Sequence, residues 1–386
     1  MASSIEWTPE AIRFGVDRES GAEIEQLTSE PVTSTNIYCE QRFASADGTR
    51  IAIARKPFGQ PGEIWVCDLR SLRICKAVTG NPIGANSALN AVYYTGIQGI
   101  RACLMRLDLT TLLVRELYHF YNDEPPPCGA VSPDEHWLIM GPYPVKDNIY
   151  AIGRANLENG RVNVLCEIED MFNPHLQFEP AFGKLSLVQI NRGGKWKLPD
   201  GGRVMTGPLG ATLSLVNVES GTVTPLPVGR PHTPGITGHE CWACKTGRVL
   251  FTAGHYNVSS SSFVTLKEPE AGQEASALYS ITPGEPAAKV VARGLMFNHL
   301  AASDDCQFFI VDDHTTGRVY IGSIVTGRYL PLCETHTRQG ACQYSHAHAY
   351  MTPDNRHVIF NSIVTGTAQV YAATVPDGFL DKVLNL

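Results

Sequence analysis

The sequence predicts an all-β protein, and specifically a seven-bladed β-propeller, from three observations. First, a polar turn followed by an alternating or apolar strand recurs along the 386 residues. Second, most of these strands are followed by another strand and a turn, which is the pattern of a hairpin. Third, almost no stretch shows the 3.6-residue periodicity of an amphipathic helix. Four-stranded units with a period of roughly 45 to 60 residues are typical of a propeller.

The units can be followed along the chain. The repeated turns begin at Ala44 (ASADGTRIAIAR), Val131 (VSPDEHWLIMG), Phe178 (FEPAFGKLSLVQ), Ala243 (ACKTGRVLFTAG), Ala302 (ASDDCQFFIVDD) and Met351 (MTPDNRHVIFNS). A seventh unit, which lacks a Pro-Asp turn, fits the segment NSALNAVYYTGIQGIRACLMRLDLTTLLVREL from Asn86. Each unit is long enough for one four-stranded blade, so the count predicts seven blades.

An early strand precedes the first full unit. The segment EIEQLT predicts a strand at about residues 22–28. If this strand pairs with the last unit, it closes the ring and removes the exposed edges. We therefore expect residues 1–386 to form a single propeller domain. Two stacked β-sandwiches are the alternative, but they do not explain the repeated turn.

Charge and composition limit the possible partners. The formal net charge is −7, the pI is near 5.9, and no run of Lys or Arg is present. We therefore expect neither nucleic acid nor a membrane as a partner, whereas a small acidic substrate needs only a local positive site such as a metal. No apolar stretch approaches the roughly 18–20 residues of a membrane span, and the first residues do not read as a signal peptide. These features favour a cytoplasmic protein with reduced cysteines, and they leave the oligomeric state open.

Four histidines share one position relative to the repeated turn. Each lies five residues before a turn residue: His348 before Pro353, His175 before Pro180, His299 before Asp304 and His239 before Cys244. In a propeller of this kind the strand before the turn is the innermost of its blade, so equivalent positions form a ring around the axis. His346 precedes His348 by two residues, and two such residues of a β-strand point to the same face. Together with the nearby amide of Gln343, these imidazoles suit Mn²⁺, Fe²⁺, Ni²⁺ or Zn²⁺.

Several motifs of the chain resemble those of the oligogalacturonate lyases. They are GHECW, NHLAASDD, QYSHAHAYMTPDN and, near the start, SGAEIEQLTSEPVTSTNIYCEQRFASADGTR. This family consists of cytoplasmic seven-bladed propellers that degrade pectin fragments by β-elimination. The resemblance covers nearly the whole chain and implies that manganese is bound by His299, Gln343, His346 and His348. It also implies a catalytic or substrate-contacting role for His239 in GHECW, and His175 matches another inward-facing histidine of the family. His175 and Gln41 are the candidate substrate-binding residues.

The chain departs from the family pattern in the fourth blade. The family has an H-E-G-P motif and an arginine before a strand, and that arginine is the expected proton abstractor. Here the region reads QINRGGKWKLPDGGRVMTGPLGATLSLVNV, without H-E-G-P and with Gly-Ala before the strand. Arg192 and Arg203 lie in this glycine-rich loop and are the candidates to bind a sugar carboxylate. The alternative is that they are solvent-exposed loop charges without a role in the site. His239 becomes the leading candidate base or acid.

The sequence therefore favours a metal-dependent lyase that acts on oligouronides and releases unsaturated uronate products. One alternative is another metal-dependent sugar enzyme on the same scaffold, which acts on a different uronide or catalyses hydrolysis or isomerisation. A second alternative is a propeller that binds a ligand or protein without catalysis, although a scaffold has no use for histidines at ligand spacing.

Overall fold

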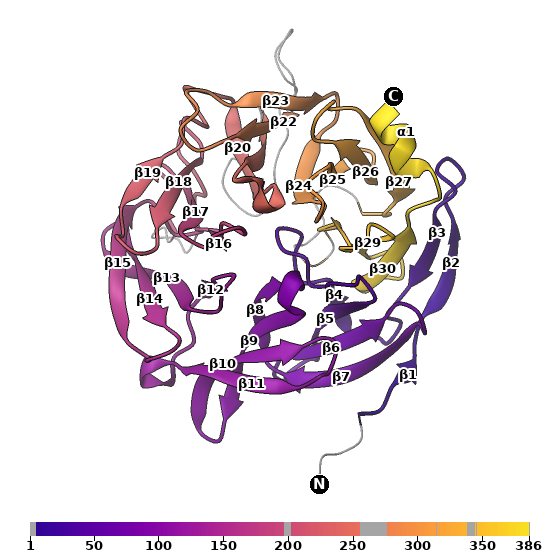
Figure 1. Cartoon of the computed structure of the whole chain (residues 1–386), viewed down its shortest axis with the longest axis horizontal. Coiled ribbons are helices and arrows are strands. Elements are labelled where there is room, and N and C mark those ends of the chain that lie inside the picture. Colours follow the sequence, from indigo (N-terminus) through magenta and orange to yellow (C-terminus); the bar gives the residue numbers. More distant parts are fainter. Residues whose placement is uncertain are drawn as a thin grey trace. The chain divides into compact units, whose positions relative to one another are not determined.

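The structure is a computed structural model that describes residues 5–196, 202–254, 276–313, 315–337, 344 and 346–385, with the side chain of residue 122 left out. These residues form seven antiparallel sheets and one short helix (Figure 1). The chain divides into two compact units. Unit 1 comprises Met1–Pro125 and His299–Leu386, and unit 2 comprises Pro126–Asn298.

Unit 1 contains four of the sheets. The first blade consists of β4 (Thr33–Thr35), β5 (Arg50–Lys56), β6 (Glu63–Asp68), β7 (Arg73–Thr79) and, at its edge, β1 (Thr8–Pro9). The second consists of β8 (Asn81–Asn86), β9 (Ala91–Gln98), β10 (Arg101–Asp108) and β11 (Val114–His119), with the 3₁₀ turns η1 (Ser87–Leu89) and η2 (Tyr121–Asp123). The sixth consists of β24 (Phe297–Ala302), β25 (Phe308–Asp313), β26 (Arg318–Ser323) and β27 (Tyr329–Glu334). The seventh consists of β28 (Tyr350–Met351), β29 (His357–Ser362), β30 (Gln369–Thr374), β3 (Glu23–Gln26) and β2 (Ile12–Val16), and the chain ends in α1 (Phe379–Asn385).

Unit 2 contains the other three sheets. The third blade consists of β12 (Cys128–Val131), β13 (Trp137–Lys146), β14 (Ile149–Asn156) and β15 (Val162–Glu169). The fourth consists of β16 (Gln177–Phe178), β17 (Leu185–Ile190), β18 (Thr212–Asn217) and β19 (Val223–Pro225). The fifth consists of β20 (Gly235–Trp242), β21 (Val249–Gly254), β22 (Ser276–Ile281) and β23 (Lys289–Arg293), with the 3₁₀ turn η3 (Cys244–Thr246) after β20. The prediction of an all-β, seven-bladed propeller is confirmed.

The repeated turn has a common hydrogen-bonding pattern. In four blades a hydroxyl donates to the aspartate two residues later: Ser45 to Asp47 at 2.6 Å, Ser132 to Asp134 at 2.5 Å, Ser303 to Asp305 at 2.5 Å and Thr352 to Asp354 at 2.7 Å. Such local bonds between short polar side chains stabilise a tight turn without long-range contacts. The apolar strand that follows each turn is largely buried; all six residues of β25, for example, are buried. The turns were therefore recognisable from the sequence alone.

The early strand β3 pairs with β30, nearly 350 residues away in the chain. Ile24 lies opposite Ala373, and β2 adds a further strand outside β3. All of these strands belong to unit 1. The organisation of the whole chain as a single domain stays a prediction.

Two further expectations concern the cysteines and the membrane. Eight cysteines of the described residues are free thiols, whereas Cys244 and Cys306 are disulfide-bonded, so the expectation of fully reduced cysteines is wrong at these two positions. Among the residues that the structure describes, no helix has both the length and the apolar character needed to cross a membrane.

Candidate functional site: a histidine cluster and its surroundings

Three histidines of unit 1 converge. The ring centroid of His299 lies 4.3 Å from that of His348 and 5.0 Å from that of His346, and the last two are 5.8 Å apart. Each ring offers a nitrogen, and these three nitrogens lie within 4.8 Å of one another. His299 and His348 are almost completely buried and His346 is partly exposed. The cluster is therefore open on the side of His346.

The chain brings His346 and His348 together in a way that the sequence did not predict. Residues 346–349 lie outside any strand, because β28 begins only at Tyr350. His348 has a φ of 43°, in the left-handed region that non-glycine residues rarely adopt. His175 has a φ of 46° at the same distance before its own turn, so these two histidines of the predicted register share a local conformation. The expectation that His346 and His348 converge on one β-strand is wrong, because a left-handed bend turns them instead.

Two asparagines hold this bend in place. The Nδ2 of Asn36 donates to the carbonyl of His348 at 2.7 Å, and the Nδ2 of Asn361 donates to the carbonyl of His346 at 3.1 Å. The two asparagines are themselves connected, since the main-chain N–H of Asn36 donates to Oδ1 of Asn361 at 2.8 Å. Both asparagines are fully buried. The ring of Tyr38 packs against His348 with a centroid separation of 4.5 Å, so the imidazole is also confined from the side.

Asp312 fixes the third histidine. Its carboxylate lies 2.8 Å and 3.1 Å from Nδ1 of His299, and it also accepts the main-chain N–H of His299 at 2.7 Å. A carboxylate on Nδ1 holds the imidazole so that Nε2 is presented to the opposite side, which is the usual support of a metal-binding histidine. Sequence reasoning missed Asp312. The signal was an aspartate within the apolar strand FFIVDD, because a buried carboxylate needs a partner.

The donor set fits a divalent transition metal. Three neutral imidazoles suit Mn²⁺, Fe²⁺, Ni²⁺ or Zn²⁺, and they would leave the ion with its full positive charge for an anionic ligand. The predicted fourth ligand, Gln343, lies outside the described residues. The assignment of His299, His346 and His348 as metal ligands stays a prediction, which their convergence and the carboxylate behind His299 support.

The other predicted histidines belong to unit 2. Glu240 in β20 is completely buried, and Nδ1 of His175 lies 3.4 Å from its Oε1. Neither oxygen of Glu240 accepts a hydrogen bond from the residues that the structure describes. A buried carboxylate of this kind is costly unless a partner balances it, and His175 is such a partner. His239 precedes Glu240 on β20 and is partly exposed. Sequence reasoning missed Glu240, although its place within the apolar end of GHECW was the available signal.

Arg192 is occupied by the main chain. Its Nε donates to the carbonyl of Gly210 at 3.0 Å, and Nη1 donates to that of Arg230 at 2.7 Å. Nη2 donates to the carbonyls of Leu209 and Ala211 at 2.7 Å and 3.3 Å. Burial, followed by the charge of Arg230, lowers the pKa of Arg192. A role for Arg192 as base or carboxylate ligand stays a prediction, and it would require several of these bonds to break.

Arg203 and Gln41 have simpler surroundings. Arg203 is exposed, and its guanidinium lies over the ring of Trp196 at 5.4 Å from the centroid. This arrangement leaves Arg203 accessible to an anion. Oε1 of Gln41 accepts the main-chain N–H of Ala85 at 2.6 Å. The assignments of Arg203 and Gln41 as site residues stay predictions.

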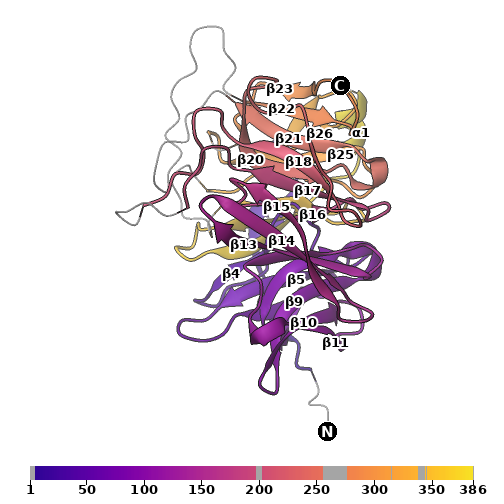
Figure 2. The same cartoon turned by 90° about the vertical axis from the view of Figure 1, so that its left-hand side faces the viewer.

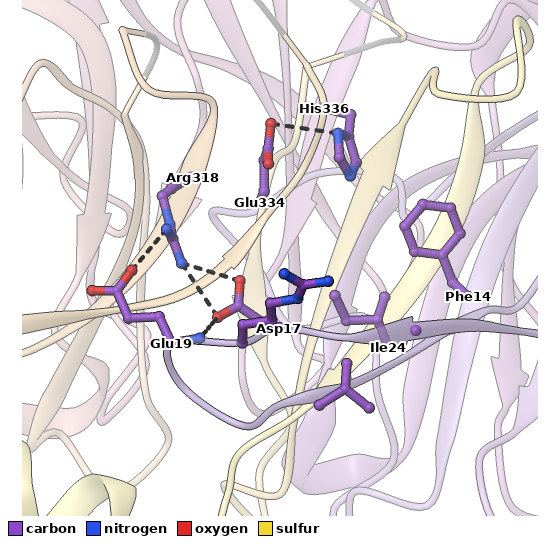
Figure 3. A pocket seen from close by; sticks show the side chains of 10 residues that line it. Phe14, Asp17, Glu19, Ile24, Arg318, Glu334 and His336 are labelled. Carbon is purple, nitrogen blue, oxygen red and sulfur yellow. Dashed lines mark hydrogen bonds and ion pairs between the residues drawn. The ribbon is translucent and has the colours of Figure 1, made fainter.

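Unit 1 also has a cavity of about 510 Å³ that no predicted site residue lines. Figure 3 shows that Phe14 and Ile24 line it beside a charged group centred on Arg318. Arg318 pairs with Asp17 at 3.0 Å and with Glu19 at 2.8 Å. Because one guanidinium faces two carboxylates, this group carries a net negative charge and would not attract an anionic sugar.

The fold and the cluster together define a β-propeller with a candidate metal centre built from histidines. No family model matches the chain. The chain is 23% identical to an oligogalacturonate lyase of Dickeya dadantii (strain 3937) over 94% of this chain and 95% of that protein. It is 22% identical, with the same coverages, to an oligogalacturonide lyase of Pectobacterium atrosepticum.

Two solved structures share the fold over almost their whole length. An oligogalacturonate lyase in complex with manganese aligns with a TM-score of 0.71 at 19% identity, covering 97% of this chain and 99% of that one. An oligogalacturonate lyase from Vibrio parahaemolyticus also aligns with a TM-score of 0.71, at 18% identity, covering 98% and 100%. The resemblance to the oligogalacturonate lyases that the motifs indicated is confirmed over nearly the whole chain, at low sequence identity.

Proposed function

We propose that the protein is a metal-dependent lyase that cleaves oligogalacturonate-like oligouronides by β-elimination and releases unsaturated uronate products. The observation that carries this proposal is the convergence of His299, His346 and His348, with Asp312 bonded to Nδ1 of His299. Its family relatives, which are named for this activity, support the same reading. A cytoplasmic location stays a prediction.

The proposed reaction must remove a proton that lies next to a negatively charged carboxylate. β-Elimination removes the C5 proton of a uronoside, next to the C6 carboxylate, and expels the glycosidic oxygen at C4. The negative carboxylate makes this proton a very weak acid. A divalent cation, for which we propose Mn²⁺, would neutralise the carboxylate and stabilise the charge that develops as the proton leaves.

The protein's own residues supply the remaining functions. Asn36 and Asn361 keep the 346–348 bend rigid. The carboxylate of Asp312 binds Nδ1 of His299, so Nε2 of that ring points away from Asp312. We propose His239 as the group that exchanges the C5 proton, because an imidazole changes protonation near neutral pH.

Two other groups would bind and orient the sugar. Arg203, exposed above Trp196, is the better candidate of the two predicted arginines for a sugar carboxylate, because Arg192 donates to four main-chain carbonyls. His175, beside the buried Glu240, would be held in a fixed orientation to contact the substrate, and Gln41 is the further substrate-binding candidate.

One observation favours the second reading, a metal-dependent enzyme for a different uronide or reaction. The fourth blade lacks H-E-G-P and an arginine before TLSLVNV, and the nearby Arg192 is enclosed by main-chain carbonyls. A changed base at this position would accompany a changed substrate or product. A panel of di- and trisaccharides of galacturonate, glucuronate and mannuronate separates the readings. Ultraviolet absorbance reports an unsaturated product, and a reducing-end assay with no such absorbance reports hydrolysis.

A further inference from the structure

A second group of potential metal ligands lies on the second blade of unit 1, away from the residues of the histidine cluster. The strands β9, β10 and β11 run side by side there (Figures 1 and 2). Cys103 on β10 lies directly opposite His119 on β11. The sulfur of Cys103, a carboxylate oxygen of Glu116 and a ring nitrogen of His119 all lie within 4.8 Å of one another.

A β-bulge in β11 creates this arrangement. Leu104 pairs with Tyr118, but the next residue of β10, Met105, pairs with Glu116, so Leu117 is an additional residue on β11. In a regular strand, residues three apart point to opposite faces, and Glu116 would face away from His119. The additional residue reverses the alternation and brings the two side chains to the same face, where the ring of His119 hydrogen-bonds to the carboxylate of Glu116. Bulges commonly re-aim a side chain in this way.

The group combines a buried donor with two accessible ones. Cys103 is completely buried, whereas the side chains of Glu116 and His119 are 32% and 40% exposed. A metal can therefore enter from solvent, and a water molecule can complete its coordination. A tetrahedral zinc separates its ligand atoms by about 3.3–3.6 Å, so atoms within 4.8 Å need a small movement of two surface side chains.

The local charge is negative. Burial raises the pKa of the Cys103 thiol, and the negative charges of Glu116 and Asp123 raise it further. Asp123 is held near the site, since its Oδ1 accepts the main-chain N–H of Ala102 at 3.2 Å. Without a cation the thiol keeps its proton. A bound dication favours the thiolate and offsets the two carboxylates.

We propose that Cys103, Glu116 and His119 form a second metal site, which binds Zn²⁺ through one thiolate, one carboxylate and one imidazole, with water as the fourth ligand. Thiolate ligands select zinc over manganese, so this site and the histidine cluster would prefer different metals. On binding, the thiol releases its proton to solvent and the sulfur electron pair forms the bond to the metal. The site would fasten β11 to β10 at the outer side of the blade.

Titration of the full chain with Co²⁺ alone tests this proposal, because Co²⁺ bound to a thiolate shows a sulfur-to-metal charge-transfer band and Co²⁺ bound only to histidines does not. We expect a band whose final amplitude corresponds to one cobalt–thiolate site per chain and which disappears when Zn²⁺ is added. The band should be absent in Cys103→Ser and retained in His348→Ala. It should also be retained in Cys75→Ser, which removes another buried thiol of unit 1.

A second variant protects the test against misfolding of Cys103→Ser. His119→Ala removes a partly exposed ligand and should weaken Co²⁺ binding by at least about tenfold. Its matched control is His136→Ala, because Nδ1 of His136 lies 3.3 Å from a carboxylate oxygen of Glu158 in a comparable, partly exposed position. The proposal is wrong if no charge-transfer band forms, if the band survives in Cys103→Ser, or if His119→Ala and His136→Ala bind Co²⁺ equally well. None of these readouts depends on lyase activity.

Discussion

Replacement of Asp312 by asparagine tests the support behind the histidine cluster. The carboxylate accepts two hydrogen bonds from His299, one from the main-chain N–H at 2.7 Å and one from Nδ1 at 2.8 Å. Asparagine has nearly the same shape but no charge, and a charge-assisted hydrogen bond is roughly twice as strong as a neutral one. Its amide nitrogen can also turn toward Nδ1, which would move the imidazole proton to Nε2 and block the metal-binding nitrogen.

Loss of such support typically weakens metal affinity by about 10–100-fold, which corresponds to about 1.4–2.7 kcal/mol. We expect isothermal titration of the metal-free protein with Mn²⁺ to show this loss for Asp312→Asn. Asp313→Asn is the matched control, because Asp313 is equally buried on the same strand but accepts the main-chain N–H of Thr315 at 2.8 Å. Equal affinities for the two variants, with both folded by circular dichroism, would refute the role given to Asp312.

Three other predictions concern stability and catalysis. Glu10 accepts a hydrogen bond from Nη2 of Arg55, a side chain that is 3% exposed. Glu10→Ala should therefore lower the free energy of unfolding in urea by about 3–5 kcal/mol, whereas exposed Glu30→Ala should not. Burial lowers the pKa of His357 below its ordinary 6.5, so the imidazole is protonated more readily in the unfolded chain than in the folded one. The free energy of unfolding should therefore fall as the pH drops below about 6.5, and His357→Asn should remove that part of the decline. His239→Ala should lower kcat on the preferred uronide by roughly 10²–10⁴-fold with unchanged metal content.

Each of these three predictions has a contradicting outcome. Matching urea midpoints for Glu10→Ala and Glu30→Ala would show that the Arg55 ion pair is dispensable. An unchanged pH profile of unfolding in His357→Asn would remove that histidine from the pH dependence. If His239→Ala retains most of its kcat, Arg203 becomes the next residue to test as the group that moves the proton.

The blades could be predicted because their signals are local. The hydroxyl-to-aspartate turns, such as Ser303 to Asp305, involve residues two apart, and the buried strand follows directly. The position of the histidines relative to these turns was equally readable. For this reason the sequence predicted the fold class and indicated that His299, His346 and His348 converge, although not the bend that brings the last two together.

The residues that the sequence did not reveal depend on distant parts of the chain or on local irregularity. The bend at His346 and His348 is held by Asn36, more than 300 residues away. The carbonyls around Arg192 come from loops up to 38 residues away, so its enclosure could not be read from its own neighbours. The bulge at Leu117 breaks the alternation from which strand faces are predicted. The alternation of residues along a strand does not reveal where a bulge interrupts it.

The central claim is that the histidine cluster supports β-elimination, and one measurement tests it most directly. Digalacturonate is incubated with metal-free protein, with the protein plus Mn²⁺, and with His348→Ala plus Mn²⁺, while ultraviolet absorbance follows the unsaturated uronate. The account predicts that absorbance rises only in the second sample and that mass spectrometry finds products without added water. Product formation at the same rate in all three samples, or cleavage with uptake of water, would contradict it.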